Sequence, residues 1–337
     1  MITKIGREKL QEFVAGLMKS GRLFAPVKEG KGTNFKLITD PQSVTLDFYN
    51  TIQSPKAVLF PQSEDLVNYN ISHDGIASEP APIDDGSRII LGVRPCDVQS
   101  FEIMDRLFNG SGIVDPYWSA RRSNLTIIAY AFDRADPVDF YNAFGITGSD
   151  EQGSDILMVR DTNSFLFKAF TDKGTKLLET MPFLEKGTAD DEKRMTEIVD
   201  KGRDIATRTL DTAEIHKRLA GIFDSPYWEE AAAACLNCGV CTYVCPTCHC
   251  FDIQDETLFG EGSRRKIWDS CMFSDFTLHA SGHNPRTKKS QRLRQRINHK
   301  FSYYVENFGI ISCVGCGRCT RSCPVNIDIL TVVEEAR

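Results

Sequence analysis

No stretch of this 337-residue sequence approaches the roughly 18 to 20 consecutive apolar residues that a membrane-spanning helix needs. The N-terminal segment 1–21 is charged throughout and lacks the uninterrupted apolar region of a signal peptide. These absences argue against membrane insertion and against export. We expect a cytoplasmic protein that meets a membrane, if at all, through a partner.

Strong positive charge and nucleotide-binding motifs are also missing. The formal net charge is -6, whereas a protein that binds nucleic acid usually offers a basic surface to the phosphates. Gly-x-Gly sequences such as those at residues 30–32 and 260–262 lack the third glycine of a dinucleotide-binding loop, and there is no P-loop. We therefore expect no nucleic-acid partner, and we expect flavin or NAD(P) to be bound by a different chain.

The N-terminal two thirds of the chain predict an α/β domain. Short apolar runs at 88–93 and 125–130 are typical of buried strands, and residues 97–108 between them have helical spacing. Residues 156–159 and 165–167 indicate a hairpin. Strands alternating with helices are typical of the α/β class.

Three weaker patterns complete this part of the prediction. Apolar positions between residues 5 and 17 have helical spacing, and residues 57–60 suggest a short strand. Residues 171–223 are helical in pattern and rich in charge. The length is about twice that of a typical domain, so a boundary is expected, and we place it near Ser225 and Pro226.

Cysteine is scarce at first and then abundant. Eleven of the twelve cysteines fall in the last 103 residues. In a protein without an export signal, such clustering indicates metal binding rather than disulfides.

Two segments, 235–246 and 313–324, share the pattern C-x2-C-x2-C-x3-C-P, which is the spacing of bacterial ferredoxins. A [4Fe–4S] cluster needs four thiolates, and three cysteines at steps of three can wrap one face of it in a tight loop. Gly239 and Gly317 lie inside these loops, where a positive φ lets the backbone curl. The repeated motif predicts two [4Fe–4S] clusters.

In two-cluster ferredoxins, the fourth cysteine of each motif binds the cluster of the other motif. We therefore assign the first cluster to Cys235, Cys238, Cys241 and Cys323. The second is assigned to Cys313, Cys316, Cys319 and Cys245. A zinc ribbon built from the same cysteines is the alternative, but zinc sites usually use two C-x2-C pairs without a third cysteine and a C-P step, so we favour iron and sulfide.

Four cysteines remain, enough for one more tetrad: Cys96, Cys248, Cys250 and Cys271. They are a candidate third [4Fe–4S] cluster, because three of them lie between the two ferredoxin motifs. Buried free thiols are one alternative, since unpaired cysteine is among the most buried residue types. A zinc site with His249 as fourth ligand is another.

These motifs fix the expected architecture. We predict an α/β domain over residues 1–225 that contributes Cys96. It is followed by a mainly helical, bacterial-type two-[4Fe–4S] ferredoxin-like domain over residues 226–337. A long insert, residues 247–312, separates the two cysteine motifs of that domain.

The insert also contains a basic stretch. Residues 276–305 have no acidic side chain but carry Arg286, Lys288, Lys289, Arg292, Arg294, Arg296 and Lys300. A solvated helix is the simplest interpretation. A surface that docks a partner, which we favour, and a shield for the charge of a cluster are the functional ones.

Several elements resemble those of a known family. They are Ser54–Gln62, the Arg-Pro-Cys-Asp sequence ending at Asp97, the Cys-Pro-Thr-Cys-His-Cys sequence ending at Cys250, and Trp-Asp-Ser-Cys271. Together with the ferredoxin motifs they are similar to the beta subunit of cytosolic [NiFe] sulfhydrogenases and to the corresponding iron–sulfur subunit of anaerobic sulfite reductase. The resemblance covers about residues 50 to 337.

The resemblance implies an electron-relay subunit of a multisubunit oxidoreductase. Such a subunit passes electrons through [4Fe–4S] clusters between a flavin- and NAD(P)-binding partner and a hydrogenase, sulfite reductase or heterodisulfide reductase-like partner, which is a catalytic or further iron–sulfur subunit. We expect no catalytic residue in a chain of this kind. The alternatives are an iron–sulfur catalytic subunit with its own site around Cys96 and Asp97, and a regulatory protein that senses clusters.

Overall fold

The computed structural model describes residues 2–110, 112–134, 136–203 and 205–336, and these form two compact units. Unit 1 comprises the chain up to Pro55, Asp85–Ala213 and Cys313–Arg318. Unit 2 comprises Lys56–Asp84, Glu214–Ser312 and the chain from Cys319 onward. This division differs from the single boundary expected near residue 225, because residues 56–84 pair with strands of the cysteine-rich part and residues 313–318 pack with the α/β part.

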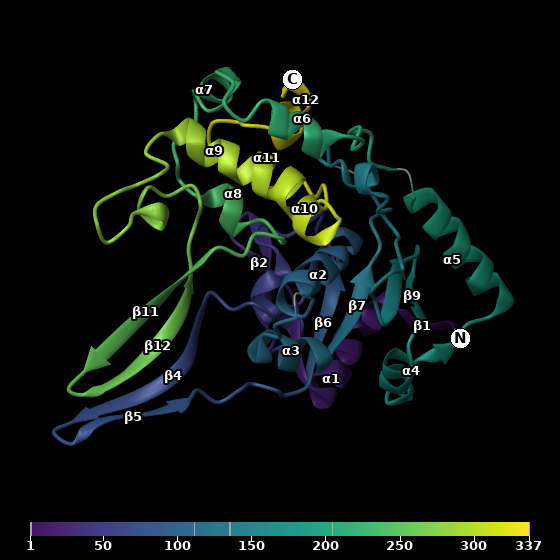
Figure 1. Ribbon diagram of the computed structural model, residues 1–337. Coiled ribbons are helices and arrows are strands. Elements are labelled where there is room, and N and C mark those ends of the chain that lie inside the picture. Colours follow the sequence, from purple (N-terminus) through teal and green to yellow (C-terminus); the bar gives the residue numbers. More distant parts are fainter. Residues whose placement is uncertain (1, 111, 135, 204, 337) are drawn as a thin grey trace. The chain divides into compact units, whose positions relative to one another are not determined.

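Unit 1 is built on a mixed β-sheet with the strand order β10-β1-β9-β8-β7-β6-β2-β3 (Figure 1). Neighbours in the centre, from β2 to β8, run parallel, and antiparallel strands extend both edges. The strands are β1 (Ile2–Gly6), β2 (Arg22–Glu29), β3 (Gly32–Leu37), β6 (Arg88–Val93), β7 (Leu125–Tyr130), β8 (Ile156–Arg160), β9 (Ser164–Ala169) and β10 (Glu185–Lys186).

Helices flank this sheet because its central strands are apolar on both faces. Every residue of β6 and β7 is buried, as expected for parallel strands covered on both sides. One apolar core joins Ile89 and Ile128 of the sheet to Phe13 of α1 and Leu178 of α4. The helices are α1 (Leu10–Ser20), α2 (Pro95–Phe108), α3 (Pro116–Ser123), α4 (Asp172–Glu179) and α5 (Ala189–Gly202).

The helix starts follow from the local sequence. Pro95 occupies the first turn of α2, where its missing N–H costs nothing. Thr171 caps α4 through its side chain. Thr188 and Asp191 form a reciprocal capping box at the start of α5, so the acidic run there is a solvated helix start.

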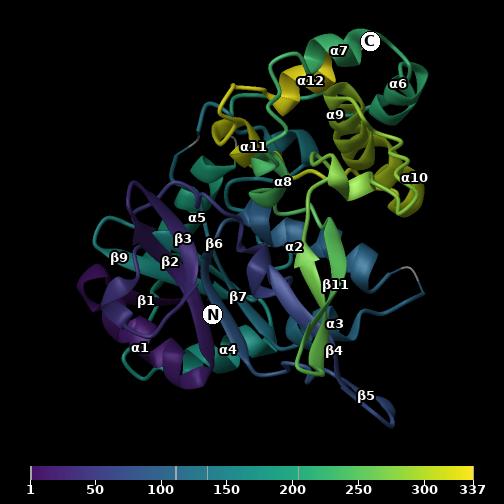
Figure 2. The same ribbon diagram turned by 90° about the vertical axis from the view of Figure 1, so that its left-hand side faces the viewer.

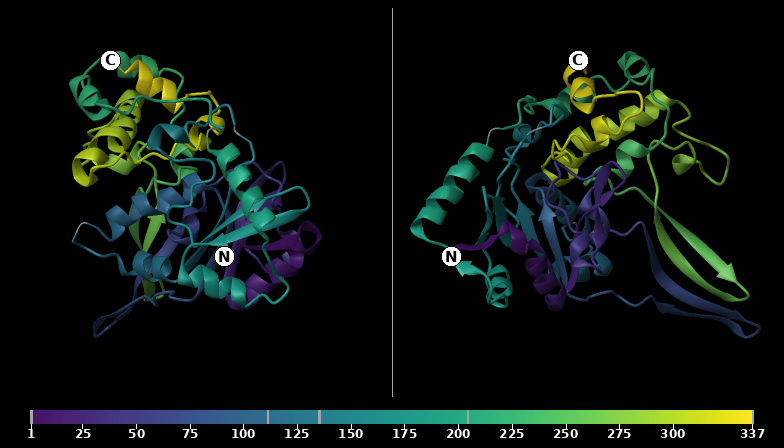
Figure 3. Two further views of the ribbon diagram at one scale, coloured as in Figure 1. Left: turned by 90° about the vertical axis from the view of Figure 1, so that its right-hand side faces the viewer. Right: turned by 180° about the vertical axis from the view of Figure 1, so that it is seen from behind.

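Unit 2 combines a β-sheet with short helices. Its strands lie in the order β11-β12-β4-β5, as two antiparallel hairpins side by side (Figures 2 and 3). They are β4 (Ser63–Ser72), β5 (Gly75–Pro80), β11 (Phe251–Leu258) and β12 (Glu261–Trp268). The helices are α6 (Ile215–Gly221), α7 (Tyr227–Ala231), α8 (Val240–Tyr243), α9 (Lys289–Asn298), α10 (Tyr304–Phe308) and α12 (Ile329–Glu335), with α11 (Arg318–Arg321) at the start of the last segment.

The structure confirms the α/β part of the sequence prediction and corrects some of its details. The strands at 88–93 and 125–130, the helix that follows residue 95 and the hairpin of β8 with β9 are all present. Residues 55–58 form a 3-10 turn instead of a strand, and the strand at residues 2–6 was not predicted. The cysteine-rich part is less helical than expected, because β11 and β12 lie in the insert. No helix among the described residues is long and apolar enough to span a membrane.

Candidate metal centre

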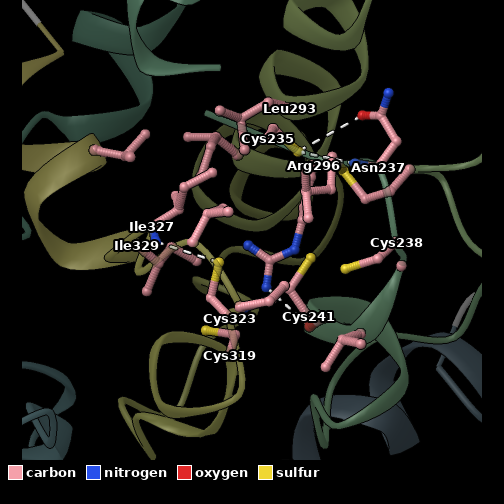
Figure 4. Close-up of a pocket in the computed structure, with 18 residues that line it drawn as sticks. Cys235, Asn237, Cys238, Cys241, Leu293, Arg296, Cys319, Cys323, Ile327 and Ile329 are labelled. Atoms are coloured by element: carbon pink, nitrogen blue, oxygen red, sulfur yellow. Dashed lines mark hydrogen bonds between the residues drawn. The ribbon is translucent and has the colours of Figure 1, made fainter. Parts of the chain in front are cut away.

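A pocket in unit 2 is lined by cysteines from both motifs (Figure 4). The cysteines of the first motif lie in the loop before α8 and in α8 itself. Those of the second motif lie in α11 and in the turn that follows it. The cysteines are Cys235, Cys238, Cys241, Cys319 and Cys323. Most of the remaining wall is apolar, including Leu236, Val240, Met272, Leu293, Ile297 and Ile329. Four of these cysteines are the set that the ferredoxin rule assigns to one cluster.

The loop of the first motif depends on a left-handed turn at Gly239. This residue has a φ of 72° and lies just before α8. A β-carbon there would lie 2.6 Å from the ring of Phe273 and 3.1 Å from the hydroxyl of Ser270. Glycine is therefore required both by the backbone conformation and by the space.

Backbone N–H groups point at two of the sulfurs. The N–H of Asn237 donates to the Cys235 sulfur at 3.4 Å, and the N–H of Ile327 donates to the Cys323 sulfur at 3.2 Å. Hydrogen bonds to ligand sulfurs stabilise negative charge on them and raise the reduction potential of an iron–sulfur cluster.

Arg296 of α9 extends between these cysteines (Figure 4). Its side chain is buried, and its Nη2 donates to the carbonyl of Cys241 at 3.1 Å. Burial acts to lower the pKa of Arg296, but the sulfurs of Cys241 and Cys319 outweigh burial and raise it. The Nε of Arg296 is buried without a hydrogen-bond partner among the described residues. The pocket therefore contains a buried guanidinium beside its sulfurs, with one N–H not used by the protein.

The donor set fits an iron–sulfur cluster. Thiols, an apolar wall and a buried cation match the ligands and the anionic charge of a cubane, and no carboxylate lines the pocket among the residues that the structure describes. Within the same residues, no three His, Cys, Asp or Glu side chains converge on one point where a single ion could sit.

The start of the second motif is embedded in unit 1, where Cys313 and Cys316 are buried. The N–H of Phe140 donates to the carbonyl of Gly315 at 2.9 Å. Gly315 has a φ of 60°, and a β-carbon there would lie 2.5 Å from backbone atoms of Phe140 and Tyr141. The loop that carries Cys313 and Cys316 is thus fitted closely to the backbone of unit 1.

Arg318 fixes the same loop through a buried ion pair. Its guanidinium donates to both carboxylate oxygens of Asp97, at 2.5 and 2.7 Å, and to the carbonyl of Thr51 at 2.9 Å. The exposed fractions of Arg318 and Asp97 are both 1%. Burial acts to lower the pKa of Arg318, and the attraction of Asp97 outweighs burial and raises it. This pair ties the second motif to the start of α2.

Cys96 lies beside this ion pair, in the first turn of α2. It is fully buried, and burial raises its pKa well above the ordinary value, so the group is a neutral thiol in the absence of a metal. Asp97 already accepts two hydrogen bonds from Arg318. An exposed nucleophile or a free general base, which a catalytic site around Cys96 and Asp97 would need, is therefore not present in this pair.

The remaining thiols of unit 2 come together in two hydrogen-bonded pairs. Cys248 donates to Cys245, and Cys271 donates to Cys250, which lowers the pKa of Cys250 to about 7. His249 instead points its Nδ1 at the carbonyl of Thr247, at 3.1 Å, and burial lowers its pKa to about 3.

The structure thus brings some predicted ligands together and divides others between the units. The first predicted set lines one pocket of unit 2. In the second set, Cys313 and Cys316 belong to unit 1, and Cys245 and Cys319 belong to unit 2. In the third set, Cys96 belongs to unit 1, and Cys248, Cys250 and Cys271 belong to unit 2.

The basic residues of the insert were named from the sequence, but which of them are buried was not predicted. Three of the basic residues between 276 and 305 are buried rather than exposed: Arg292, Arg296 and Lys300. They recur at every fourth position, which on a helix puts them on one face. That spacing, in a stretch without acidic residues, was the signal in the sequence for a buried basic face. The burial of these three side chains favours a shield for cluster charge over a surface that docks a partner.

Comparisons with known proteins agree with this geometry. Residues 234–327 match a family model described as a 4Fe-4S dicluster domain. The whole chain is similar to "Sulfhydrogenase 2 subunit beta" of Pyrococcus furiosus, with 29% identity over 340 residues that cover 99% of this chain and 98% of the relative. No solved structure was found to match the chain.

Proposed function

We propose that this chain, which is similar over nearly its whole length to a sulfhydrogenase beta subunit, is an iron–sulfur electron-transfer subunit of a multisubunit oxidoreductase. The observation that carries this proposal is the pocket of unit 2, where five cysteines from the two ferredoxin motifs line a mostly apolar wall with one buried arginine. A bound [4Fe–4S] cluster supplies reversible one-electron transfer. The pocket contains no carboxylate that could serve as a general acid or base among the described residues.

The residues of this pocket have separate roles. Cys235, Cys238, Cys241 and Cys323 bind the first cluster. The N–H groups of Asn237 and Ile327 stabilise negative charge on the ligand sulfurs. The apolar side chains keep water away from the cluster, so that little reorganisation accompanies electron transfer. Arg296 favours the reduced state, because that state carries the extra negative charge.

The second motif provides the second cluster. Cys313, Cys316 and Cys319 are its proposed ligands, and the ferredoxin rule adds Cys245 as the fourth. Cys96, Cys248, Cys250 and Cys271 are the cysteines left for a third [4Fe–4S] cluster. A chain of two or three clusters gives electrons a path through the protein.

The proposed partners lie at the two ends of this path. One binds flavin and NAD(P), because this sequence has no motif for either. The other is a hydrogenase, sulfite reductase or heterodisulfide reductase-like subunit, and the complex is cytoplasmic. Purification of the native complex, followed by identification of its subunits, tests this part of the proposal directly.

We expect Cys323→Ser to remove about four irons per chain and one EPR-active centre after anaerobic purification, since a cubane rarely survives the loss of a thiolate. Iron and sulfide analysis and reductive titration followed by EPR provide the measurement. Ser322→Ala in the same turn is the matched control and should keep the full iron content. A wild-type chain with no iron, or with no reducible centre, would contradict the proposal.

A further inference from the structure

The ferredoxin rule assigns neighbouring thiols of unit 2, outside the first pocket, to different clusters. That rule sends Cys245 to one cluster and leaves Cys248 for another. In the structure these two thiols share a hydrogen bond, and Cys250 shares one with Cys271. Cys248 is also near enough to Cys271 to raise its pKa. The chain segments that carry these four thiols therefore lie together within unit 2.

The chain itself brings these segments together. Cys245, Cys248 and Cys250 follow one another in a C-x2-C-x-C sequence. The N–H of Asp269 donates to the carbonyl of Cys250 at 3.0 Å, which fixes the segment ending at Cys271 beside the first three cysteines. This grouping uses only residues of unit 2.

Buried cations surround the same sulfurs. Lys56 is 3% exposed, and its Nζ donates to the carbonyls of Cys248, at 2.9 Å, and Thr242, at 3.2 Å. Lys300 is also 3% exposed, and its Nζ donates to the hydroxyl of Thr247 at 2.7 Å. Arg296 is near enough to Cys245 and Cys248 for both to raise its pKa.

These cations need an anion. Burying an ammonium or guanidinium group is costly unless a negative charge lies close to it. No carboxylate forms an ion pair with Lys56 or Arg296 among the described residues. The ammonium of Lys56 lies over the Trp268 ring, 4.2 Å from its centroid, and the anionic groups nearest to both cations are cysteine sulfurs. Four thiolates around an iron–sulfide core carry a net negative charge, which neutral thiols do not.

Cys96 has a different neighbourhood, in unit 1. Cys316 is near enough to raise the pKa of Cys96. The ion pair between Asp97 and Arg318 joins the residue next to Cys96 to a residue two positions after Cys316. Cys96 is therefore held near the second motif within its own unit.

We infer that Cys245, Cys248, Cys250 and Cys271 hold an iron–sulfur cluster of their own, in a site neutralised by Lys56, Arg296 and Lys300. Cys96 then joins Cys313 and Cys316 of its own unit as a ligand of the second cluster, in place of Cys245. The inference rests on the proposed function, because it assumes that the chain binds clusters, but it changes which cysteines form the second and third sets.

The ligand sets are tested by comparing single Cys→Ser variants of the full chain, purified anaerobically and examined by iron analysis and EPR. The wild type should contain about twelve irons. Cys245→Ser and Cys248→Ser should remove the same EPR signal, and Cys96→Ser should alter the signal that Cys316→Ser removes. Ser322→Ala is again the control.

Other results would overturn the inference but would not contradict the proposed function. They are about eight irons in the wild type, zinc in place of the third cluster, or a Cys245→Ser variant that loses the Cys316 signal and keeps the Cys248 signal. A chain without any iron would instead overturn the proposed function itself.

The role of the cations is tested separately, through the reduction potential of the cluster that they neutralise. In Lys56→Met, we expect the reduction equilibrium of the centre assigned to Cys248 to become about tenfold less favourable, which is about 59 mV for one electron. The reduction potential of the centre assigned to Cys323 should change less than that of the centre assigned to Cys248. Lys288→Met, at an exposed position, is the matched control. An unchanged potential in Lys56→Met would show that Lys56 does not neutralise this site.

Discussion

Arg318→Met is expected to destabilise unit 1 by about 3–5 kcal/mol, because it leaves the carboxylate of Asp97 buried without its partner. The lost hydrogen bonds to Thr51 add to the effect. Thermal unfolding followed by circular dichroism should show a fall of roughly 10 °C in the transition of this unit. Because Arg318 also fixes the loop of Cys313 and Cys316, iron content should fall as well.

Two further variants make this result interpretable. Arg203→Met removes an arginine from an exposed pair with Asp200, at 3.2 Å, and should change stability by less than about 1 kcal/mol. Arg318→Met combined with Asp97→Asn removes the unpaired charge and should recover part of the loss. If Arg318→Met unfolds no earlier than Arg203→Met, then the buried pair does not stabilise unit 1.

The α/β fold could be predicted because its signals are local. The apolar runs of β6 and β7 and the helical period of α2 are properties of short segments, and burial on both faces of a parallel sheet leaves them almost free of polar residues. The hairpins of unit 2 could not be predicted in the same way. Residues of β5 and β11 are exposed along their whole length, so no apolar alternation marks them.

The proposed cysteine ligands could be named from the sequence because metal binding fixes the residue type and the spacing together. The side chains that hold these ligands were not. Arg318 lies in the second motif at a position where the ferredoxin pattern allows any residue, and its partner Asp97 is 221 positions away. Lys56 reaches the carbonyl of Cys248 across 192 positions. Contacts at such separations leave no local pattern.

The division of the chain into units was hidden for the same reason. A boundary can be inferred from composition only where the chain crosses once between domains. Here residues 56–84 supply β4 and β5 to the sheet of unit 2, and residues 313–318 belong to unit 1. The second ferredoxin motif is therefore split between Arg318 and Cys319, which no feature of its spacing indicates.

Gly315→Ala is the second substitution from which we expect a large effect. The φ of 60° at this position costs alanine about 1 kcal/mol or more. The added methyl group would also lie 2.5 Å from backbone atoms of Phe140 and Tyr141, and relieving such an overlap costs roughly 1–3 kcal/mol. The loop should move away from unit 1, and the EPR signal that depends on Cys316 should weaken or disappear.

Gly145→Ala separates the two causes. Gly145 also lies in unit 1 and has a φ of 71°, but no atom lies within 4 Å of its added β-carbon. This variant should lose only the backbone contribution, about 1 kcal/mol, and it should keep its full iron content. If Gly315→Ala resembles Gly145→Ala in both urea denaturation and iron analysis, the loop does not need its close fit to residues 140–141. A loss of iron in Gly315→Ala alone would mean that this fit positions the ligands of the second motif.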